Sequence, residues 1–173
     1  RFASIVAYAG LCTLASLEGI ISSLGAKILS NDNEMTIDQF TRQARGYASS
    51  ASIRSEGALN RMVELAQLHA DDVTLDVACG PGLIVCAFAP HVRQATGIDL
   101  TPAMLEEARQ LQHARGLTNV TWIQCDVCHL PFADGAFSVV TSRYAFHHFP
   151  EPSAVLREMV RVTRPGGTVL VAD

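Results

Sequence analysis

The sequence has little charge and no run of basic residues. Charged side chains make up 17% of its 173 residues, and the formal net charge is −4. A protein held mainly by phosphate contacts needs clustered Lys and Arg, so this composition argues against a nucleic-acid partner. Internal repeats and low-complexity tracts are also lacking, while 49% of the residues are hydrophobic. We therefore expect one globular domain with a sizeable core.

The sequence also lacks the second cysteine pair that would complete a four-ligand zinc site, so no metal site is predicted. Its cysteines are odd in number and lie mostly in apolar segments. They are Cys12, Cys79, Cys86, Cys125 and Cys128. Buried free thiols in a reducing cytoplasm are the expected state.

The N-terminal part differs in composition from the rest. Residues 2–29 are almost entirely apolar or small. They fit three interpretations: a signal-like or membrane-touching segment, a buried helix, or sequence outside the mature protein. Glu18 would lie near the middle of a membrane-spanning helix, at appreciable cost. A polar cluster at residues 30–34 follows and is expected to break the chain. We therefore hypothesise that residues 35–173 form the functional domain and that residues 1–34 are dispensable. Membrane contact is expected only if residues 1–29 belong to the mature protein.

One stretch organises the remaining chain: Val73 to Gly82, which reads V-T-L-D-V-A-C-G-P-G. An apolar strand pattern ends in a glycine-bearing turn, and an apolar helix pattern follows over residues 83–89. The N-terminus of that helix would point at whatever lies over the turn. Gly80 and Gly82 place no Cβ between the backbone and a ligand, so main-chain N–H groups could approach it closely.

Strand and helix patterns alternate along the chain. Two helical patterns come first, one with Phe40, Ala44 and Tyr47 on a face and one ending near His69. After the glycine turn, further strands are predicted over residues 94–99, 120–125 and 137–142 and from Thr168 onward, with helices between them. This alternation predicts an α/β fold with a doubly wound, mostly parallel, Rossmann-like sheet. The chain stops within the fifth strand, so we expect a C-terminally truncated domain with an unpaired sheet edge.

Acidic residues mark three successive strands. Asp76 lies in the first strand, Asp99 ends the second and Asp126 follows the third. Ligands of doubly wound sheets lie beyond the carboxyl ends of the strands. Asp99 follows Asp76 at the spacing of about 20 residues at which this fold places an acceptor for ribose hydroxyls. Asp126 is placed to accept a hydrogen bond from an adenine amine or to order the adjacent loop.

The glycine turn does not fit nucleotides that carry phosphates. The dinucleotide fingerprint needs a third glycine, where this chain has Leu83 or Val85. No Lys followed by Ser or Thr stands at P-loop spacing. A phosphate-free nucleoside with a cationic centre suits the acidic lining better, and S-adenosylmethionine is such a ligand.

Five segments together resemble class I S-adenosylmethionine-dependent methyltransferases, and within them the branch that includes the ubiquinone/menaquinone-biosynthesis enzymes. They read D-V-A-C-G-P-G at 76–82, G-I-D-L-T-P-A-M-L at 97–105, C-D-V at 125–127, L-P-F-A-D-G-A-F at 130–137 and R-P-G-G at 164–167. Each motif is weak alone, but the five in this order are specific together. The resemblance covers residues 40–173. It implies the class I fold and S-adenosylmethionine as the cofactor.

The resemblance also implies roles for individual residues. The methionine part of the cofactor would be held by Asp76, Arg143 and the backbone of Ala78, Cys79, Gly80, Pro81 and Gly82. The nucleoside would be bound by Asp99 at the ribose and by Leu100, Met104, Asp126 and Val127 at the adenine. Tyr47 matches an aromatic residue that closes over the cofactor.

The chain departs from the family at two positions and at its end. Ala78 stands where many members have glycine, which is a mild change if its φ is negative. Ser138 replaces an aspartate that is common after the Phe. The family's last two strands are absent.

His147 and His148 follow the fourth strand, on a loop that should face the substrate. Either could be the general base for the acceptor's proton, since histidine titrates near neutral pH. The alternative is that they only pack and cap this loop together with Phe146 and Phe149.

Cys125, Cys128 and His129 form a C-x-x-C-H pattern, which is typical of covalent c-type haem attachment. With the apolar N-terminus, this pattern gives the remote alternative of an exported haem protein. Against it, Cys125 closes an apolar strand pattern, and the segment overlaps the carboxylate expected at the cofactor.

The predicted function is therefore S-adenosylmethionine-dependent methyl transfer to a small-molecule acceptor in the cytoplasm. The cofactor supplies the chemistry, so no protein nucleophile is needed, and no recognisable triad is present. The alternative from another class is a non-catalytic module that binds an adenosine ligand.

Overall fold

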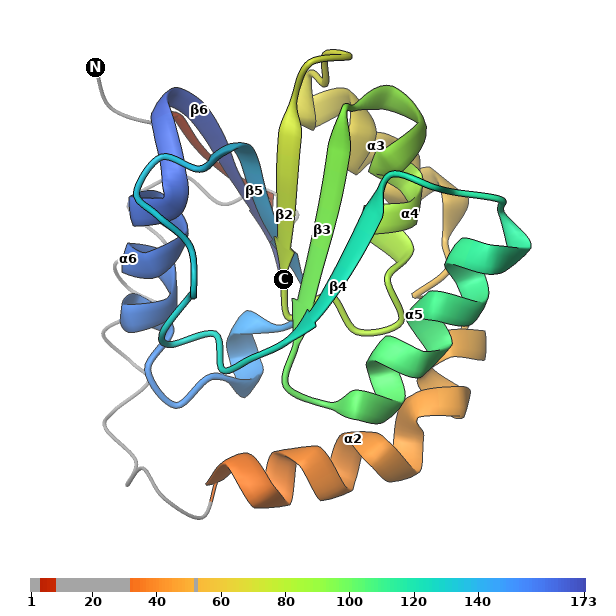
Figure 1. Cartoon of the computed structure of the whole chain (residues 1–173). Helices are drawn as coiled ribbons and strands as arrows, with labels where there is room; N and C mark the ends of the chain where they lie inside the picture. The colour runs from red at the N-terminus through yellow and green to blue at the C-terminus, as the bar shows by residue number, and fades with distance from the viewer. Residues whose placement is uncertain (1–3, 9–31, 52) are drawn as a thin grey trace.

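A six-stranded sheet forms the centre of the computed structural model, which describes residues 4–8, 32–51 and 53–173 (Figure 1). The strands are β1 (Ser4–Tyr8), β2 (Val73–Val77), β3 (Gln94–Asp99), β4 (Val120–Gln124), β5 (Phe137–Arg143) and β6 (Thr163–Ala172). They lie in the order β1-β6-β5-β2-β3-β4, and all neighbouring strands are parallel. The chain order reverses between β2 and β5, so the ligand site of such a fold lies at the carboxyl ends of these central strands.

Helices cover both faces of the sheet, which confirms the predicted doubly wound α/β fold (Figure 1). The helices are α2 (Asp32–Ser49), α3 (Glu56–Ala66), α4 (Leu83–Phe88), α5 (Pro102–Ala114) and α6 (Pro152–Val162). On one face, Val155 and Met159 of α6 pack in the core with Leu75 and Val140 of the sheet. On the other face, α3 and α4 pack against β5 and β6 in a second cluster. Burial of these apolar side chains is the main source of stability.

Helix α2 lies across the carboxyl ends of the strands (Figure 1). It begins at Asp32, so it runs through the boundary predicted between residues 34 and 35. The polar cluster that was expected to break the chain here is partly helical. The division into a dispensable segment and a functional domain stays a prediction.

The expectation of an unpaired edge beyond the fifth predicted strand, β6, is wrong for this structure. β1 pairs in parallel with β6, from Ser4 opposite Thr168 to Tyr8 opposite Ala172. An apolar run fits a strand of a parallel sheet as well as a buried helix, and periodicity alone does not separate the two. Residues 9–31 lie outside the described residues, so the three interpretations of the N-terminal segment stay untested there. Within residues 4–8, 32–51 and 53–173, no helix has the length and apolarity to cross a membrane.

Local signals in the sequence place most element ends correctly. Pro102 begins α5 after the extended residue Thr101, and Gly116, with φ of +63°, follows its end. β6 differs because it begins at Thr163 and not at Thr168. Phe137 pairs with Thr163 and Val139 with Thr168, so the Pro-Gly-Gly turn is an irregularity within the strand.

Gly82 is needed for packing inside the protein. The sequence predicted instead that this glycine lets a ligand approach the turn. A Cβ built on it would lie 2.4 Å from Cη2 of Trp122 and 2.9 Å from Cβ of Ala108. Real Cβ atoms do not approach so closely, so the indole ring of Trp122 needs a glycine here. The φ of Gly82 is also positive, at +75°.

We predict that Gly82→Ala lowers the free energy of unfolding by about 3 kcal/mol, because overpacking adds to the cost of a left-handed backbone. Gly116→Ala is the matched control. Gly116 has a similar φ of +63°, but nothing lies within 4 Å of its added Cβ, so it should lose only about 1 kcal/mol. Urea unfolding measures both values, and equal losses would contradict the steric explanation.

Candidate active site

A cavity of about 690 Å³ opens at the carboxyl ends of the central strands. Small-molecule sites have volumes of about 300–1,000 Å³, so the cavity can hold a nucleoside-sized ligand. Its walls come from the turns after β2 and β3, the loop after β4, the segment after β5, and helix α2. This is the place where a doubly wound sheet binds its ligand.

The structure brings most of the residues singled out from the sequence to this cavity. Those that line it are Tyr47, Asp76, Ala78, Cys79, Gly80, Pro81, Asp99, Leu100, Met104, Asp126, Val127, Arg143 and His148. Gly82 and His147 are not among the lining residues. Five separate segments of the chain thus meet around one space.

The glycine turn after β2 presents backbone to the cavity at Gly80. This residue has φ of +52°, and the nearest atom to an added Cβ is Cε1 of Tyr47 at 3.9 Å. The N–H of Gly80 donates to Oδ2 of Asp99 at 2.8 Å, and the N–H of Cys79 donates to the carbonyl of Ile98 at 2.8 Å. These two hydrogen bonds join the turn to β3, and the opposite side of the turn faces the cavity.

We expected alanine in place of glycine at position 78 to be a mild change if the φ of Ala78 were negative, and it is not negative. Its φ is +55°, a left-handed conformation that costs a residue with a Cβ about 1 kcal/mol or more. Tyr144, directly after β5, has φ of +56° and also lines the cavity. Strained backbone at two points around one cavity is typical of functional sites.

Asp99 is a carboxylate that several hydrogen bonds fix at the cavity. It is 9% exposed, and its oxygens accept the N–H groups of Gly80 and Thr101, each at 2.8 Å. Burial raises the pKa of Asp99, while these backbone hydrogen bonds lower it. The hydroxyl of Thr101 and the backbone N–H of Leu100 also hydrogen-bond to this carboxylate and lower its pKa, while burial keeps the pKa raised.

Asp76 lies deeper, with 4% of its surface exposed. Thr141 Oγ1 donates to its Oδ1 at 2.6 Å. Burial raises the pKa of Asp76 to about 7, against the hydrogen bond from Thr141 and the positive charge of Arg143, and the charge of Asp99 adds to the rise. A cation in the cavity would favour the ionised form.

Arg143 at the end of β5 carries an unsatisfied donor. Its Nη2 donates to the carbonyl of Ile53, and its guanidinium carbon lies 4.7 Å from the ring centre of Tyr144. Its Nη1 is buried with no hydrogen-bond partner among the described residues. Burial lowers the pKa of Arg143, although arginine stays charged at neutral pH. An orphaned, buried cationic donor is costly, and an anionic ligand group would satisfy it.

Asp126 joins the loop after β4 to helix α2. Its Oδ1 accepts the N–H of Cys128 at 2.9 Å, and its Oδ2 accepts Nδ2 of Asn33 at 3.0 Å. Burial raises the pKa of Asp126, but these bonds outweigh it, so the pKa is lowered. Sequence reasoning missed Asn33, because it lies in the polar cluster interpreted as a break in the chain.

Helix α2 also covers the cavity with aromatic side chains. Phe40 packs edge-on against Tyr47 and against the His148 ring, with ring centres 6.3 Å and 5.0 Å apart. Burial raises the pKa of Tyr47, so its hydroxyl stays neutral. The helical spacing of Phe40, Ala44 and Tyr47 indicated an apolar face, but it did not show that this face closes a cavity.

The two adjacent histidines lie in different surroundings. Burial and the neighbouring His147 lower the pKa of His148, so its ring is neutral at neutral pH and lines the cavity. His147 pairs instead with Asp173. Its Nδ1 lies 2.8 Å from Oδ1 of Asp173, and its backbone N–H donates to Oδ2 at 3.1 Å. Of the two predicted bases, only His148 is placed at the cavity.

The haem-like pattern is built into the same region. Cys128 and His129 line the cavity, and Cys125 packs against the apolar core. Burial raises the pKa of both thiols to about 11. Thiols with so high a pKa stay protonated and are poor nucleophiles at neutral pH.

We predict a specific pH dependence of stability from Asp76. Its native pKa of about 7 lies above the value of about 4 for an exposed aspartate, so between these pH values the native state holds a proton that the unfolded state has released. The stability that Asp76 contributes is therefore present at low pH and is lost as the pH rises to about 7.

Asp76→Asn removes this titration and keeps the shape of the side chain. The free energy of unfolding of the wild type minus that of Asp76→Asn should fall between about pH 4 and pH 7 and then level off. Asp71→Asn, which removes an exposed carboxylate before β2, is the control. Urea unfolding across this range measures the differences, and a constant difference for Asp76→Asn would contradict the shift.

Comparisons with known proteins agree with this geometry. Residues 75–171 match a family described as a methyltransferase domain. The uncharacterized methyltransferase YcgJ of Bacillus subtilis (strain 168) is 33% identical over 134 residues, which are 78% of this chain and 53% of that protein. Its crystal structure superposes with a TM-score of 0.63 at 35% identity, over 66% of this chain and 49% of the other.

Two further relatives carry more specific names. The demethylmenaquinone methyltransferase of Thermus thermophilus is 39% identical over 116 residues, which are 65% of this chain and 52% of that protein. The crystal structure of the [4+2]-cyclase SpnF superposes with a TM-score of 0.61 at 29% identity, over 65% of this chain and 43% of the other. The chain spans about half the length of the curated relatives it matches.

Proposed function

The chain belongs to the methyltransferase domain family, and on that premise we propose that it binds S-adenosylmethionine in the cavity and transfers a methyl group to a small-molecule acceptor. One observation carries the proposal. A buried acid with a raised pKa, Asp76, lines the same cavity as Arg143, whose buried Nη1 has no hydrogen-bond partner among the described residues. Their charges complement the ammonium and carboxylate groups of an amino acid.

The remaining acids suit the nucleoside half of the same ligand. Asp99 is a carboxylate acceptor for the ribose hydroxyls in the cavity wall, and Leu100 and Met104 line the cavity beside it. Asp126 and Val127 offer an acceptor and an apolar contact for the adenine. Of the residues that the structure describes, no lysine lines the cavity, and the carboxylates would repel a pyrophosphate.

The bound cofactor supplies a methyl group on a positively charged sulfur, which a nucleophilic acceptor can attack without a protein nucleophile. The chain's own residues orient the reactants and exclude water, with Phe40 and Tyr47 of α2 covering the cavity. A ring nitrogen of neutral His148 takes the acceptor's proton. His147 lies outside the cavity and does not touch the reactants.

Calorimetry with S-adenosylhomocysteine and 5′-methylthioadenosine tests the proposal, because the second ligand lacks the amino-acid half. Arg143→Met should weaken S-adenosylhomocysteine by roughly 2 kcal/mol, or about thirtyfold, since a charge-assisted hydrogen bond is lost. The affinity for methylthioadenosine should not change. Asp99→Asn should weaken both ligands, because both carry the ribose. Failure of the wild type to bind either, or equal losses in Arg143→Met, would overturn the assignment.

We predict that His148→Asn slows methyl transfer by about a hundredfold, because a general base is lost. His147→Asn is the matched control and should retain nearly full turnover. The measurement is transfer of labelled methyl groups by the full-length protein to the small-molecule fraction of a cell extract. S-adenosylhomocysteine should bind both variants like the wild type, and unchanged turnover in His148→Asn would exclude the base role.

A second candidate is a module that binds an adenosine ligand without transferring a methyl group. One solved structure similar to this chain is named as a [4+2]-cyclase and not as a methyltransferase. This name supports the second candidate. Binding of S-adenosylmethionine without transfer to any acceptor would support this candidate. The haem alternative has less support, because the family match over residues 75–171 includes Cys125, Cys128 and His129.

We propose a cytoplasmic location, which the free thiols support. The cysteines of the described residues are free, namely Cys79, Cys86, Cys125 and Cys128, as expected in a reducing compartment.

A further inference from the structure

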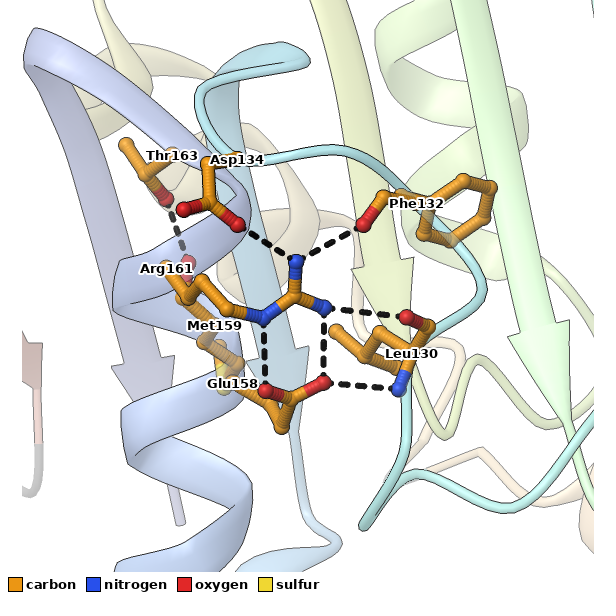
Figure 2. A network of polar contacts seen from close by, with 7 residues as sticks. All are labelled: Leu130, Phe132, Asp134, Glu158, Met159, Arg161 and Thr163. Carbon is orange, nitrogen blue, oxygen red and sulfur yellow. Dashed lines mark hydrogen bonds and ion pairs between the residues drawn. The ribbon is translucent and has the colours of Figure 1, made fainter.

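The loop between β4 and β5 forms one wall of the cavity, although it contains no helix or strand. Its first half, residues 126–129, lines the cavity. Its second half, residues 130–135, lies against α6 (Figure 2). Such loops are usually among the most mobile parts of a protein, so a precise wall requires that something hold this one.

Arg161 of α6 uses all five of its N–H donors, three on the loop and two on Glu158 of its own helix (Figure 2). Nε and Nη2 donate to the two carboxylate oxygens of Glu158 at 2.7 and 2.8 Å. Nη1 donates to the carbonyl of Phe132 at 2.7 Å and to Oδ1 of Asp134 at 2.9 Å. The second N–H of Nη2 donates to the carbonyl of Leu130 at 2.9 Å. A guanidinium has five N–H groups, so its capacity is filled.

Glu158 and Arg161 together hydrogen-bond both backbone groups of Leu130, as a neighbouring β-strand would. The N–H of Leu130 donates to Oε2 of Glu158 at 2.8 Å, while its carbonyl accepts from Arg161. Both backbone groups of one loop residue are thus satisfied by side chains of α6. The Leu130 side chain is buried in the core, which holds the same residue from the other side.

The fixed Leu130 directly follows the turn that lines the cavity. Within that turn, the N–H of Cys128 donates to Asp126 Oδ1 at 2.9 Å, and the N–H of His129 donates to the Asp126 carbonyl at 3.3 Å. The turn is therefore held between the end of β4 and Leu130. A shift of Leu130 would move the Asp126 carboxylate.

We propose that Glu158 and Arg161 are positioning residues for the cavity wall formed by residues 126–129. By holding Leu130, they keep the Asp126 carboxylate where it accepts a hydrogen bond from the amine of the adenine. The ligand's identity rests on the proposed function. The shape of the guanidinium is essential, because lysine keeps the charge but presents three donors from one point and cannot reach Glu158, Leu130, Phe132 and Asp134 together.

The test compares Arg161→Met and Arg161→Lys with Arg164→Met. Arg164 is a matched control, since its Nη2 lies 3.4 Å from Oδ1 of Asp72 at the end of the sheet opposite the cavity. Two ligands are titrated by calorimetry: S-adenosylhomocysteine and S-inosylhomocysteine, in which a carbonyl replaces the amine. Hydrogen exchange is followed in residues 125–135 and in β2 and β3.

Both Arg161 variants should lose about tenfold of the wild type's preference for the adenine ligand, because one hydrogen bond to the amine is weakened. Hydrogen exchange at Cys128 and His129 should be at least tenfold faster, with exchange in β2 and β3 unchanged. Arg164→Met should show neither effect. An unchanged ratio of the two affinities, or rescue by lysine, would overturn the positioning role. If the wild type binds neither ligand, the proposed function fails, and the exchange contrast between Arg161→Met and Arg164→Met still decides whether α6 holds the loop.

Discussion

The site depends on the carboxylate of Asp99, because it joins two turns that would otherwise be independent. One oxygen accepts the N–H of Gly80 after β2, and the other accepts the N–H of Thr101 before α5. The N–H of Cys125 in turn donates to the carbonyl of Asp99 at 3.2 Å, so the loop after β4 begins from the same residue. Three walls of the cavity therefore take their positions from one side chain and its backbone, and a ligand bound to Asp99 would contact a preorganised frame.

Several features of the cavity are unfavourable for the protein alone. Ala78 and Tyr144 have left-handed backbones, Asp76 is buried with a raised pKa, and Arg143 carries a buried donor without a described partner. Each lowers the stability of the ligand-free fold, and all lie around one space, as is usual where strain and desolvation serve binding. The sheet and the apolar clusters packed against it offset this cost.

Features set by residues that are close together in the chain could be predicted from the sequence. Features set by contacts between distant residues could not. Pro102 and Gly116 bound α5 by local backbone chemistry, so that helix could be placed correctly. The role of Gly82 could not be predicted in this way. The Trp122 ring, which leaves no room for a Cβ at Gly82, comes from a strand far along the chain. His147 and His148 look equivalent in sequence, and only their contacts with Asp173 and the cavity separate them. The Arg161 network likewise joins a helix to a loop that precedes it in the chain.

The pairing of β1 with β6 has a consequence for how the protein is made. On the ribosome, Ser4–Tyr8 is synthesised long before Thr168–Ala172, its partner in the sheet. A contact between such distant segments carries a large loop-closure entropy and forms slowly. Until β1 docks, the edge of β6 that it covers has no partner among the described strands and can pair with another chain. Of the described strand pairs, this one therefore joins the segments that are synthesised furthest apart in time, and β1 stays unpaired for the longest part of synthesis.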